Sequence, residues 1–198
     1  MLKKSVTKKK YECGTDEAGR GALAGPVTAA AVILPNGFKN KWITDSKKLS
    51  PNKRNDLRKI ILNEAVSYGV FHVTCQEIDK FNILNASIHA MHKAIDQLPK
   101  VNFIAVDGNK FKKYHDIPFK TIIKGDSKYL NIAAASILAK TFRDDLMKKI
   151  HCEFPMYNWW GNKGYPTKEH KLAITKYGPC KYHRKSFKLF TEQLNFEF

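Results

Sequence analysis

Hydrophobic residues near the start of the chain fall into two β-rich runs separated by glycines. The first run covers residues 11–16, and the second is the continuous apolar stretch of residues 27–34. Glycines at positions 19, 21 and 25 interrupt the pattern between the two runs. Because short apolar runs bounded by glycine and proline are typical of buried strands, the pattern predicts two neighbouring strands joined by a glycine-rich turn.

The rest of the chain alternates between helical and strand patterns. Ser50 followed by Pro51 is a typical helix start, and it predicts a helix that extends to about residue 68. Further helices are predicted at residues 82–98, 130–150 and 167–177 and around residues 186–194, and further strands at residues 69–74, 103–106 and 119–123. Strands that come first and then alternate with helices indicate an α/β fold, in which helices cover a sheet.

The composition changes twice along the chain and divides it into three parts. Residues 1–10 are rich in lysine and are expected to form a disordered basic N-terminus. Residues 11–150 contain the predicted strands and the longest helices, so they form the main domain. Beyond Pro155 the chain becomes rich in tryptophan, tyrosine, glycine and lysine, and residues 151–198 are expected to form a small helical extension.

Positive charge dominates the composition, with 35 Lys and Arg residues against 18 Asp and Glu residues and a formal net charge of +17. Such an excess favours polyanions as ligands, because phosphates neutralise the cations and release counterions. A basic surface kept for solubility is the alternative. No apolar run reaches the roughly 18 residues of a membrane helix, and the four cysteines lack Cys-x-x-Cys spacing. We therefore expect a cytoplasmic protein without membrane partners, zinc or disulfides.

Four carboxylates stand at predicted junctions of this basic chain: Asp16 and Glu17 before a Gly-Arg-Gly turn, Asp107 after a strand and Asp126 before a helix. Adjacent strand residues point to opposite faces, so Asp16 and Glu17 share a site only if the backbone bends there. Carboxylates that face phosphates require cations between them, and Mg²⁺ or Mn²⁺ suits oxygen ligands. Caps of helices and solvated turns are the alternative roles for each carboxylate taken singly.

Eight short motifs change the balance between these alternatives. They are DEAGRG at residues 16–21, DSKKLS at 45–50, NILNA at 82–86, VDGN at 106–109, KGDS at 124–127, AASILAK at 134–140, KGYPT at 163–167 and HRKSF at 183–187. In this order they resemble the ribonuclease HII family, the bacterial type 2 ribonucleases H, over almost the whole chain after residue 11. The resemblance implies an RNase H-like α/β fold, with a mixed five-stranded sheet flanked by helices and a small helical C-terminal extension.

The same resemblance implies the activity and its centre. The family's metal-binding and catalytic carboxylates fall on Asp16, Glu17, Asp107 and Asp126. The implied enzyme is an endoribonuclease that cuts the RNA strand of RNA/DNA hybrids and cuts at ribonucleotides embedded in duplex DNA, leaving 5′-phosphate and 3′-hydroxyl ends. Two Mn²⁺ or Mg²⁺ ions are expected with substrate bound, because such a pair can activate the attacking water and stabilise the leaving oxygen.

Substrate contacts are implied at a second group of residues. By the resemblance, the backbone of Gly19, Arg20 and Gly21 reads the 2′-hydroxyl at the cut, and Tyr165 stacks on the adjoining deoxyribose. Glycine lets main-chain groups approach closely, and the 2′-hydroxyl is what distinguishes RNA from DNA. Candidate phosphate contacts are Lys47 and Arg184, together with Lys48, Arg143 and Lys185.

Three alternatives remain open from the residues. Another nuclease of the RNase H-like superfamily, such as a junction resolvase, would use the same carboxylates, but the Gly-Arg-Gly turn and Tyr165 argue against it. A non-catalytic RNA-binding module gains nothing from concentrating negative charge beside phosphates. Type 3 ribonucleases H carry an additional N-terminal domain and differ at the fourth carboxylate, which is Asp126 here.

Two segments depart from the family pattern or extend beyond it. Paired tryptophans occur at residues 159 and 160, shortly before the KGYPT motif, so the conformation of that loop is not implied by the resemblance. In residues 193–198, Gln193 precedes Leu194, Phe196 and Phe198, which loosely resembles peptides that dock on the bacterial sliding clamp. Packing of these apolar residues on the C-terminal helix is the favoured alternative.

Overall fold

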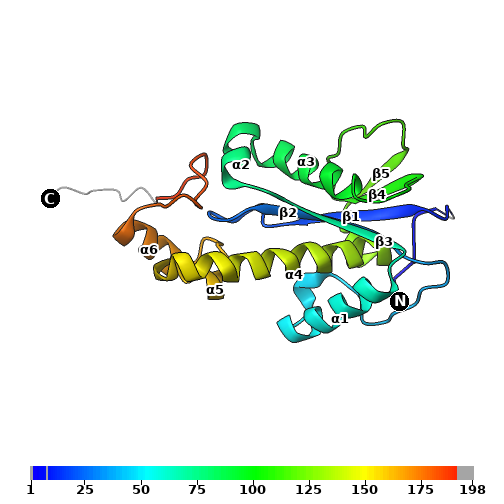
Figure 1. The fold of residues 1–198 in the computed structure, drawn as a ribbon, viewed down its shortest axis with the longest axis horizontal. Coiled ribbons are helices and arrows are strands. Elements are labelled where there is room, and N and C mark those ends of the chain that lie inside the picture. The colour runs from blue at the N-terminus through cyan, green and yellow to red at the C-terminus, as the bar shows by residue number, and fades with distance from the viewer. Residues whose placement is uncertain (1, 8, 191–198) are drawn as a thin grey trace.

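A mixed five-stranded sheet forms the centre of the computed structural model, which describes residues 2–7 and 9–190 (Figure 1). The strands are β1 (Glu12–Ala18), β2 (Val27–Ile33), β3 (Ser67–Val73), β4 (Phe103–Asp107) and β5 (Phe119–Ile122), in the spatial order β3-β2-β1-β4-β5. Pairing is antiparallel between β1 and β2 and between β2 and β3. It is parallel between β1 and β4 and between β4 and β5. The predicted mixed α/β sheet is confirmed.

Helices cover both faces of this sheet (Figure 1). They are α1 (Pro51–Glu64), α2 (Cys75–Phe81), α3 (Ile83–Ile95), α4 (Leu130–Glu153), α5 (Trp159–Asn162) and α6 (Lys168–Tyr177), with short 3-10 turns at Ser46–Lys48, Gly125–Ser127 and Pro155–Tyr157. Along β2, Ala29 and Ala31 pack in the core under α3, whereas Ala30 and Val32 pack in the core under α4 and α1. Because β2 is buried on both faces, its sequence is a continuous apolar run rather than an alternating one.

Two predicted helices end earlier than the sequence pattern indicated. The helix predicted to reach residue 68 ends at Glu64, and Tyr68 instead lies in β3 opposite Val32. The helix predicted at residues 82–98 is α3, which ends at Ile95, and the preceding helix α2 was not predicted; Asn82, with a φ of 63°, separates the two. Thr74 caps α2, and its hydroxyl accepts a hydrogen bond from the Glu77 N–H.

The long helix α4 lies directly against β1 and carries Ser136 and Lys140, which line the site described below. A Cβ atom at Gly14 would lie 2.3 Å from the carbonyl carbon of Asn131, so only glycine allows this contact between strand and helix. The alanines at residues 133–135 are fully buried and keep the helix close to the sheet. This close packing holds the part of α4 that follows in a fixed position relative to β1.

The beginning of the chain differs from the disordered basic end that was predicted. Lys3 forms a β-bridge with Tyr129 at the start of α4. The buried carboxylate of Glu12 accepts hydrogen bonds from the main-chain N–H groups of Val6, at 2.7 Å, and Thr7, at 2.6 Å. A buried carboxylate needs such donors, because an unpaired charge is costly to bury. Residues 2–7 are therefore held to β1 and α4 by specific main-chain contacts.

The C-terminal extension packs on the last turns of α4, which continues to Glu153, three residues past the predicted domain boundary. The shared core comprises Leu23, Ala24, Met147, Ile150, Tyr157, Trp159, Ala173, Ile174 and Leu189. The helix predicted around residues 186–194 is absent from the part that the structure describes, residues 186–190, and residues 191–198 lie outside it. Across residues 2–7 and 9–190, no helix has the length and apolar character needed to span a membrane.

Candidate active site

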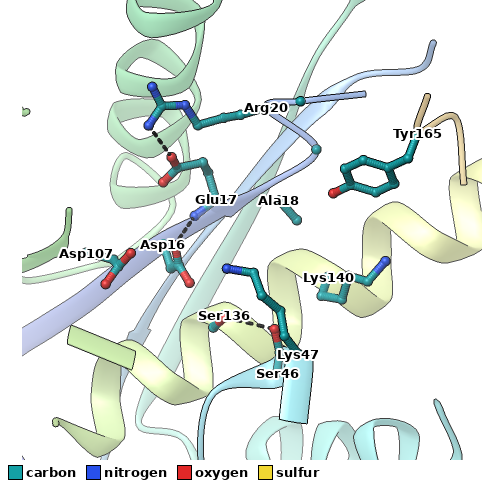
Figure 2. A pocket seen from close by; sticks show the side chains of 12 residues that line it. Asp16, Glu17, Ala18, Arg20, Ser46, Lys47, Asp107, Ser136, Lys140 and Tyr165 are labelled. Carbon is teal, nitrogen blue, oxygen red and sulfur yellow. Dashed lines mark hydrogen bonds and ion pairs between the residues drawn. The ribbon is translucent and has the colours of Figure 1, made fainter. Parts of the chain in front are cut away.

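The first two site carboxylates lie where the sheet opens. β1 pairs with β4 only as far as Thr15, opposite Val106, whereas its pairing with β2 continues to the end of the strand. Asp16 and Glu17 thus have a strand on one side only, and Asp107 directly follows Val106 on the other side of the gap (Figure 2). The predicted backbone bend is wrong, since both residues belong to regular β1. The opening of the sheet, rather than a bend, lets adjacent side chains border one cavity.

Asp16 is buried, with 6% of its surface exposed, the same fraction as Asp126. Its Oδ1 accepts a hydrogen bond from the Glu17 N–H at 2.7 Å, and the Ser136 hydroxyl of α4 also hydrogen-bonds to the carboxylate. Burial raises the pKa of Asp16 well above its usual value, and the charges of Glu17 and Asp107 raise it further. The ionised form of Asp16 is therefore short of compensating charge.

Glu17 makes an ion pair within the turn that follows β1. Its Oε1 lies 3.2 Å from Nη1 of Arg20, and the arginine side chain is half exposed (Figure 2). Burial nevertheless raises the pKa of Glu17. The charge of Arg20 lowers this pKa, and the charge of Asp107 raises it. A partly exposed pair of this kind is weak and easily exchanged for another partner.

Asp107 and Asp126 are joined through the 3-10 turn at Gly125–Ser127. Oδ1 of Asp107 accepts a hydrogen bond from the Gly125 N–H at 2.7 Å, and the Asp126 N–H lies 3.4 Å from the same atom. The Ser127 hydroxyl donates to Oδ1 of Asp126 at 3.2 Å. Burial raises the pKa of Asp126, and repulsion by Asp107 and Asp45 adds to the shift. The charge of Asp107 thus raises the pKa of both Asp16 and Asp126.

A cavity of about 590 Å³ opens beside Asp16, Glu17 and Asp107, whereas Asp126 does not line it. It is lined by Asp16, Glu17, Ala18, Gly19, Arg20, Gly21, Ser46, Lys47, Asp107, Ser136, Lys140 and Tyr165 (Figure 2). The carboxylates occupy one side, the ring of Tyr165 points in from the other, and the side chain of Lys47 extends into it. Acidic groups, cations and an aromatic ring therefore face a common space that is large enough for a nucleotide.

Divalent cations fit the carboxylate set by its chemistry. Hard oxygen donors are the ligands that Mg²⁺ and Mn²⁺ prefer, and a bound cation would relieve the repulsion that raises the pKa of Asp16. Within residues 2–7 and 9–190, no three Asp, Glu, His or Cys side chains are already grouped closely enough to enclose an ion. Binding would therefore require side-chain rotation, above all of Glu17 away from Arg20.

The predicted recognition turn and Tyr165 meet on the far side of the cavity, although 144 residues separate Gly21 from Tyr165 in sequence. Gly19 has a φ of 95°, which side chains rarely tolerate, and its carbonyl accepts a hydrogen bond from the Ala22 N–H at 3.3 Å. Arg20 and Gly21 are exposed. Two main-chain hydrogen bonds, from the Leu23 and Ala24 N–H groups to Gly164 O, join the turn to the Tyr165 loop.

The basic residues predicted to contact phosphates divide into two groups. Lys47, Lys48 and Lys185 are exposed, and Lys47 lines the cavity, so they stay candidates for phosphate contacts. The assignment is wrong for Arg143 and Arg184, which are 0% exposed. Their guanidinium groups donate hydrogen bonds to main-chain carbonyl oxygens inside the protein, so they have no free donor face for a phosphate.

Three residues of the cavity wall were not assigned a role from the sequence. Ser136 and Lys140 lie four residues apart on α4 and therefore on the same face of the helix. Ser46 approaches from the 3-10 turn at Ser46–Lys48, and its hydroxyl lies 3.1 Å from that of Ser136. All three belong to the DSKKLS and AASILAK motifs. For Ser136 and Lys140, their spacing as polar residues in an otherwise apolar helix was a signal in the sequence that could have identified them.

A buried pair of histidines supports the Tyr165 loop. Trp159 Nε1 donates to His170 Nε2 at 3.0 Å, so His170 Nδ1 carries the hydrogen that it donates to Tyr165 O, also at 3.0 Å. His183 Nε2 lies 3.2 Å from His170 Nε2 and must be the donor there, while His183 Nδ1 accepts from the Cys180 N–H. These directions require both rings to be neutral. Burial and the neighbouring His170 lower the pKa of His183 to about 4.

Acidification from pH 7 to pH 5 is expected to reduce the free energy of unfolding by about 2 kcal/mol through His183 alone. Between its usual pKa near 6.5 and the folded value of about 4, the unfolded chain binds a proton that the folded chain does not. This contribution is complete above pH 6.5 and declines as the pH falls toward 4. Urea unfolding at both pH values measures it, and the His183→Gln variant should lack it.

The control for this experiment is His115→Gln, because His115 is exposed. That variant should keep the pH dependence of the original protein. Equal pH dependence in the His183→Gln variant and the original protein would show that His183 is not held neutral by its surroundings.

Comparisons with known proteins show which family the chain belongs to and which structures share its fold. The ribonuclease HII family model matches residues 13–190. A ribonuclease HII of Christiangramia forsetii is 63% identical over 186 residues, which cover 93% of this chain and 94% of the relative. The fold is similar to that in the PCNA:RNase HII complex from Archaeoglobus fulgidus, with a TM-score of 0.77, 23% identity, and coverage of 93% of this chain and 98% of that one.

A second solved structure has the same fold in a related class. Bst-RNase HIII in complex with Mn²⁺ gives a TM-score of 0.72 at 15% identity and covers 90% of this chain, but only 67% of its own chain is matched. The family match excludes the resolvase and the non-catalytic RNA-binding module as readings of this sequence. The chain belongs to the ribonuclease HII family, whose members are type 2 ribonucleases H: divalent-metal-dependent endoribonucleases that act on RNA/DNA hybrids.

Proposed function

We propose that this enzyme hydrolyses the phosphodiester beside a ribonucleotide, both in RNA/DNA hybrids and at single ribonucleotides embedded in duplex DNA. The observation that carries the proposal is the meeting of Asp16, Glu17 and Asp107 with the glycine turn and Tyr165 around one cavity. A chain of net charge +17 that gathers the buried Asp16 and Asp126 with the partly buried Glu17 and Asp107 gains from doing so only if cations join them to a phosphate.

The residues of the site divide the chemistry between them. Two Mg²⁺ or Mn²⁺ ions on the four carboxylates supply, when bound, an activated water and a stabilised leaving oxygen, which gives 5′-phosphate and 3′-hydroxyl ends. The hydrogen bond from the Gly125 N–H fixes the direction of the Asp107 carboxylate. The amino group of Lys47 brings positive charge to the same cavity and favours the approach of the phosphate backbone, whereas that of Lys140 is paired with Asp144 at 2.6 Å.

The turn is suited to recognition of the 2′-hydroxyl by its main chain. Gly21 is exposed, and a methyl group placed there would meet no protein atom within 4 Å. Packing within the protein therefore gives no reason for glycine at this position, whereas close approach of a ribose to the backbone does. Tyr165 lines the same cavity as the turn and can stack on the sugar that follows the ribonucleotide (Figure 2).

One assay tests the proposal directly. A DNA duplex with a single ribonucleotide is incubated with the enzyme and Mg²⁺, Mn²⁺ or EDTA, beside a long RNA/DNA hybrid and an all-DNA duplex. We expect cleavage of the first two substrates with either ion, none with EDTA, and none of the all-DNA duplex. Cleavage of the long hybrid alone would reject recognition of single ribonucleotides, and cleavage of all-DNA substrate would reject the role of the turn.

Replacement of Tyr165 by alanine is expected to slow cleavage at a single ribonucleotide about 100-fold while changing duplex affinity less than about threefold. Phosphate contacts supply most of the affinity, whereas the ring positions the sugar. Single-turnover rates and binding to an all-DNA duplex measure the two effects separately. Tyr177→Ala is the matched control, because Tyr177 is an exposed tyrosine on α6 that does not line the cavity. Equal losses of rate and affinity would contradict the positioning role.

We further propose a sliding clamp as a partner of residues 193–198, which lie outside the described residues. Support comes from the sequence of Gln193, Leu194, Phe196 and Phe198, and from the structure of a relative solved in a complex with PCNA. Deletion of residues 195–198 is expected to abolish binding to purified clamp and to leave the melting temperature unchanged. A marked fall in melting temperature, or no binding by the full chain, would assign these residues to packing instead.

A further inference from the structure

Two arginines are buried behind the recognition turn without a carboxylate partner. Arg143 on α4 and Arg184 in the HRKSF motif are both 0% exposed. Among the described residues, neither forms an ion pair with an aspartate or glutamate. Burial of a guanidinium group is costly unless its donors are satisfied. Burial and the charge of Arg143 lower the pKa of Arg184 to about 10, so Arg184 keeps its charge at neutral pH.

Arg184 donates hydrogen bonds to carbonyl groups of the turn and of the segment that follows it. Its Nη2 donates to Gly19 O at 2.7 Å and to Gly25 O at 2.9 Å. Its Nη1 donates to Arg20 O at 2.9 Å, and its Nε donates to Gly25 O at 3.0 Å. Carbonyl oxygens of the turn and of the following segment therefore point toward one guanidinium group inside the protein. The conformation of the turn depends on the position of that group.

Arg143 connects the turn segment to the Tyr165 loop. Its Nε donates to Pro26 O at 2.8 Å and its Nη2 to Ala24 O at 3.1 Å, both in the segment that follows the turn. Its Nη1 donates to Lys163 O at 2.9 Å, two residues before Tyr165, and its guanidinium carbon lies 5.4 Å from the centre of the Tyr165 ring. One side chain thus contacts both halves of the predicted recognition site.

We propose that Arg143 and Arg184 are specificity-determining positioning residues, which fix the Gly19–Gly21 turn at the distance from Tyr165 that a ribonucleotide requires. The inference rests on the proposed function, in which the turn reads the 2′-hydroxyl and Tyr165 stacks on the next sugar. The planar guanidinium reaches several carbonyls in fixed directions, which the single ammonium of lysine cannot do. Neither arginine touches substrate, and both act through the turn and Tyr165.

The experiment uses Arg143→Lys and Arg184→Lys, which keep the charge and remove the fixed geometry. Single-turnover cleavage at a single ribonucleotide is expected to slow at least tenfold in each variant. Affinity for an all-DNA duplex should change less than threefold, because the exposed lysines are intact. Arg58→Lys is the control: Arg58 contacts α4 at Asp145 and Phe142 but reaches neither the turn nor the Tyr165 loop, and its variant should cleave at the original rate.

A double-mutant cycle separates positioning from general loss of structure. If Arg143 acts by placing Tyr165 relative to the turn, Arg143→Lys should cost less than threefold in a Tyr165→Ala background. Losses that multiply in the double variant, or an unchanged rate in both Arg→Lys variants, would overturn the proposal. Circular dichroism checks folding, and Arg143→Lys alone suffices for the test if Arg184→Lys does not fold, since Arg143 contacts both segments.

The outcomes also distinguish this inference from the proposed function. If Tyr165→Ala cleaves at the original rate, the proposed role of Tyr165 fails, and the positioning inference fails with it. If Tyr165→Ala is slow but both Arg→Lys variants cleave normally, the proposed function stands and only the positioning inference is overturned.

Discussion

The Asp107→Asn variant is expected to fold normally and to cleave about 1,000-fold more slowly than the original enzyme, equivalent to about 4 kcal/mol of transition-state stabilisation. Asparagine keeps an oxygen that accepts the hydrogen bond from the Gly125 N–H, so the turn at Gly125–Ser127 should be retained. What is lost is the negative charge that acts on both Asp16 and Asp126. Single-turnover cleavage in Mg²⁺, with circular dichroism as the folding check, measures this effect.

Substrate affinity of the same variant should be equal or higher, because one source of repulsion toward phosphates is removed. Asp116→Asn is the matched control, since the Asp116 side chain is 95% exposed and forms only a surface ion pair with Lys113. That substitution should leave both rate and affinity unchanged. Cleavage by Asp107→Asn at the original rate in Mg²⁺ would exclude Asp107 from the metal site.

The second large effect is expected from Gly19→Ala, which should lower the free energy of unfolding by about 2 kcal/mol and slow cleavage at least tenfold. A side chain is strained at the φ of 95° found there. In addition, the new Cβ would lie 2.1 Å from Nε of Arg143, so the buried arginine must move and the turn with it. Urea unfolding and single-turnover cleavage test the two parts of this prediction.

Gly37→Ala separates backbone strain from displacement of the arginine. Gly37 has a φ of 83°, similar to that of Gly19, but a Cβ there would meet no atom within 4 Å. The control should therefore lose stability by a comparable backbone effect and keep the cleavage rate. If both glycine variants cleaved equally well, the turn would not depend on its contact with Arg143.

The sheet and its long helices could be predicted from the sequence, because apolar runs and periodicity report burial locally. Helix α2, which was not predicted, could have been recognised, since Thr74 and Glu77 have the spacing of a capping box at its start. The end of α1 could not. Tyr68 continues a helical pattern, and it lies in a strand because residues 67–73 pair with β2, a contact with a distant segment that overrides local propensity.

For the site, the motifs located the residues but not their environments. Asp16, Glu17 and Asp107 border one cavity as predicted, although their roles remain a proposal. The opening of the sheet beyond Thr15 depends on where pairing with β4 stops, and the sequence of β1 does not contain that information. Arg143 and Arg184 resembled surface cations because their partners are backbone carbonyls of distant segments, and carbonyl groups leave no signature in a sequence.

Strand β1 buries a carboxylate near each end, and the two are treated differently. Glu12 is surrounded by donors from the protein: the N–H groups of Val6 and Thr7 and the amide of Asn131, at 2.8 Å. Asp16 has fewer such donors, and its raised pKa means that its ionised form is destabilised in the folded protein. Any cation that binds there therefore stabilises the native state by mass action. Removal of the metal should therefore leave this enzyme inactive and lower its melting temperature, so the melting temperature reports how much metal is bound.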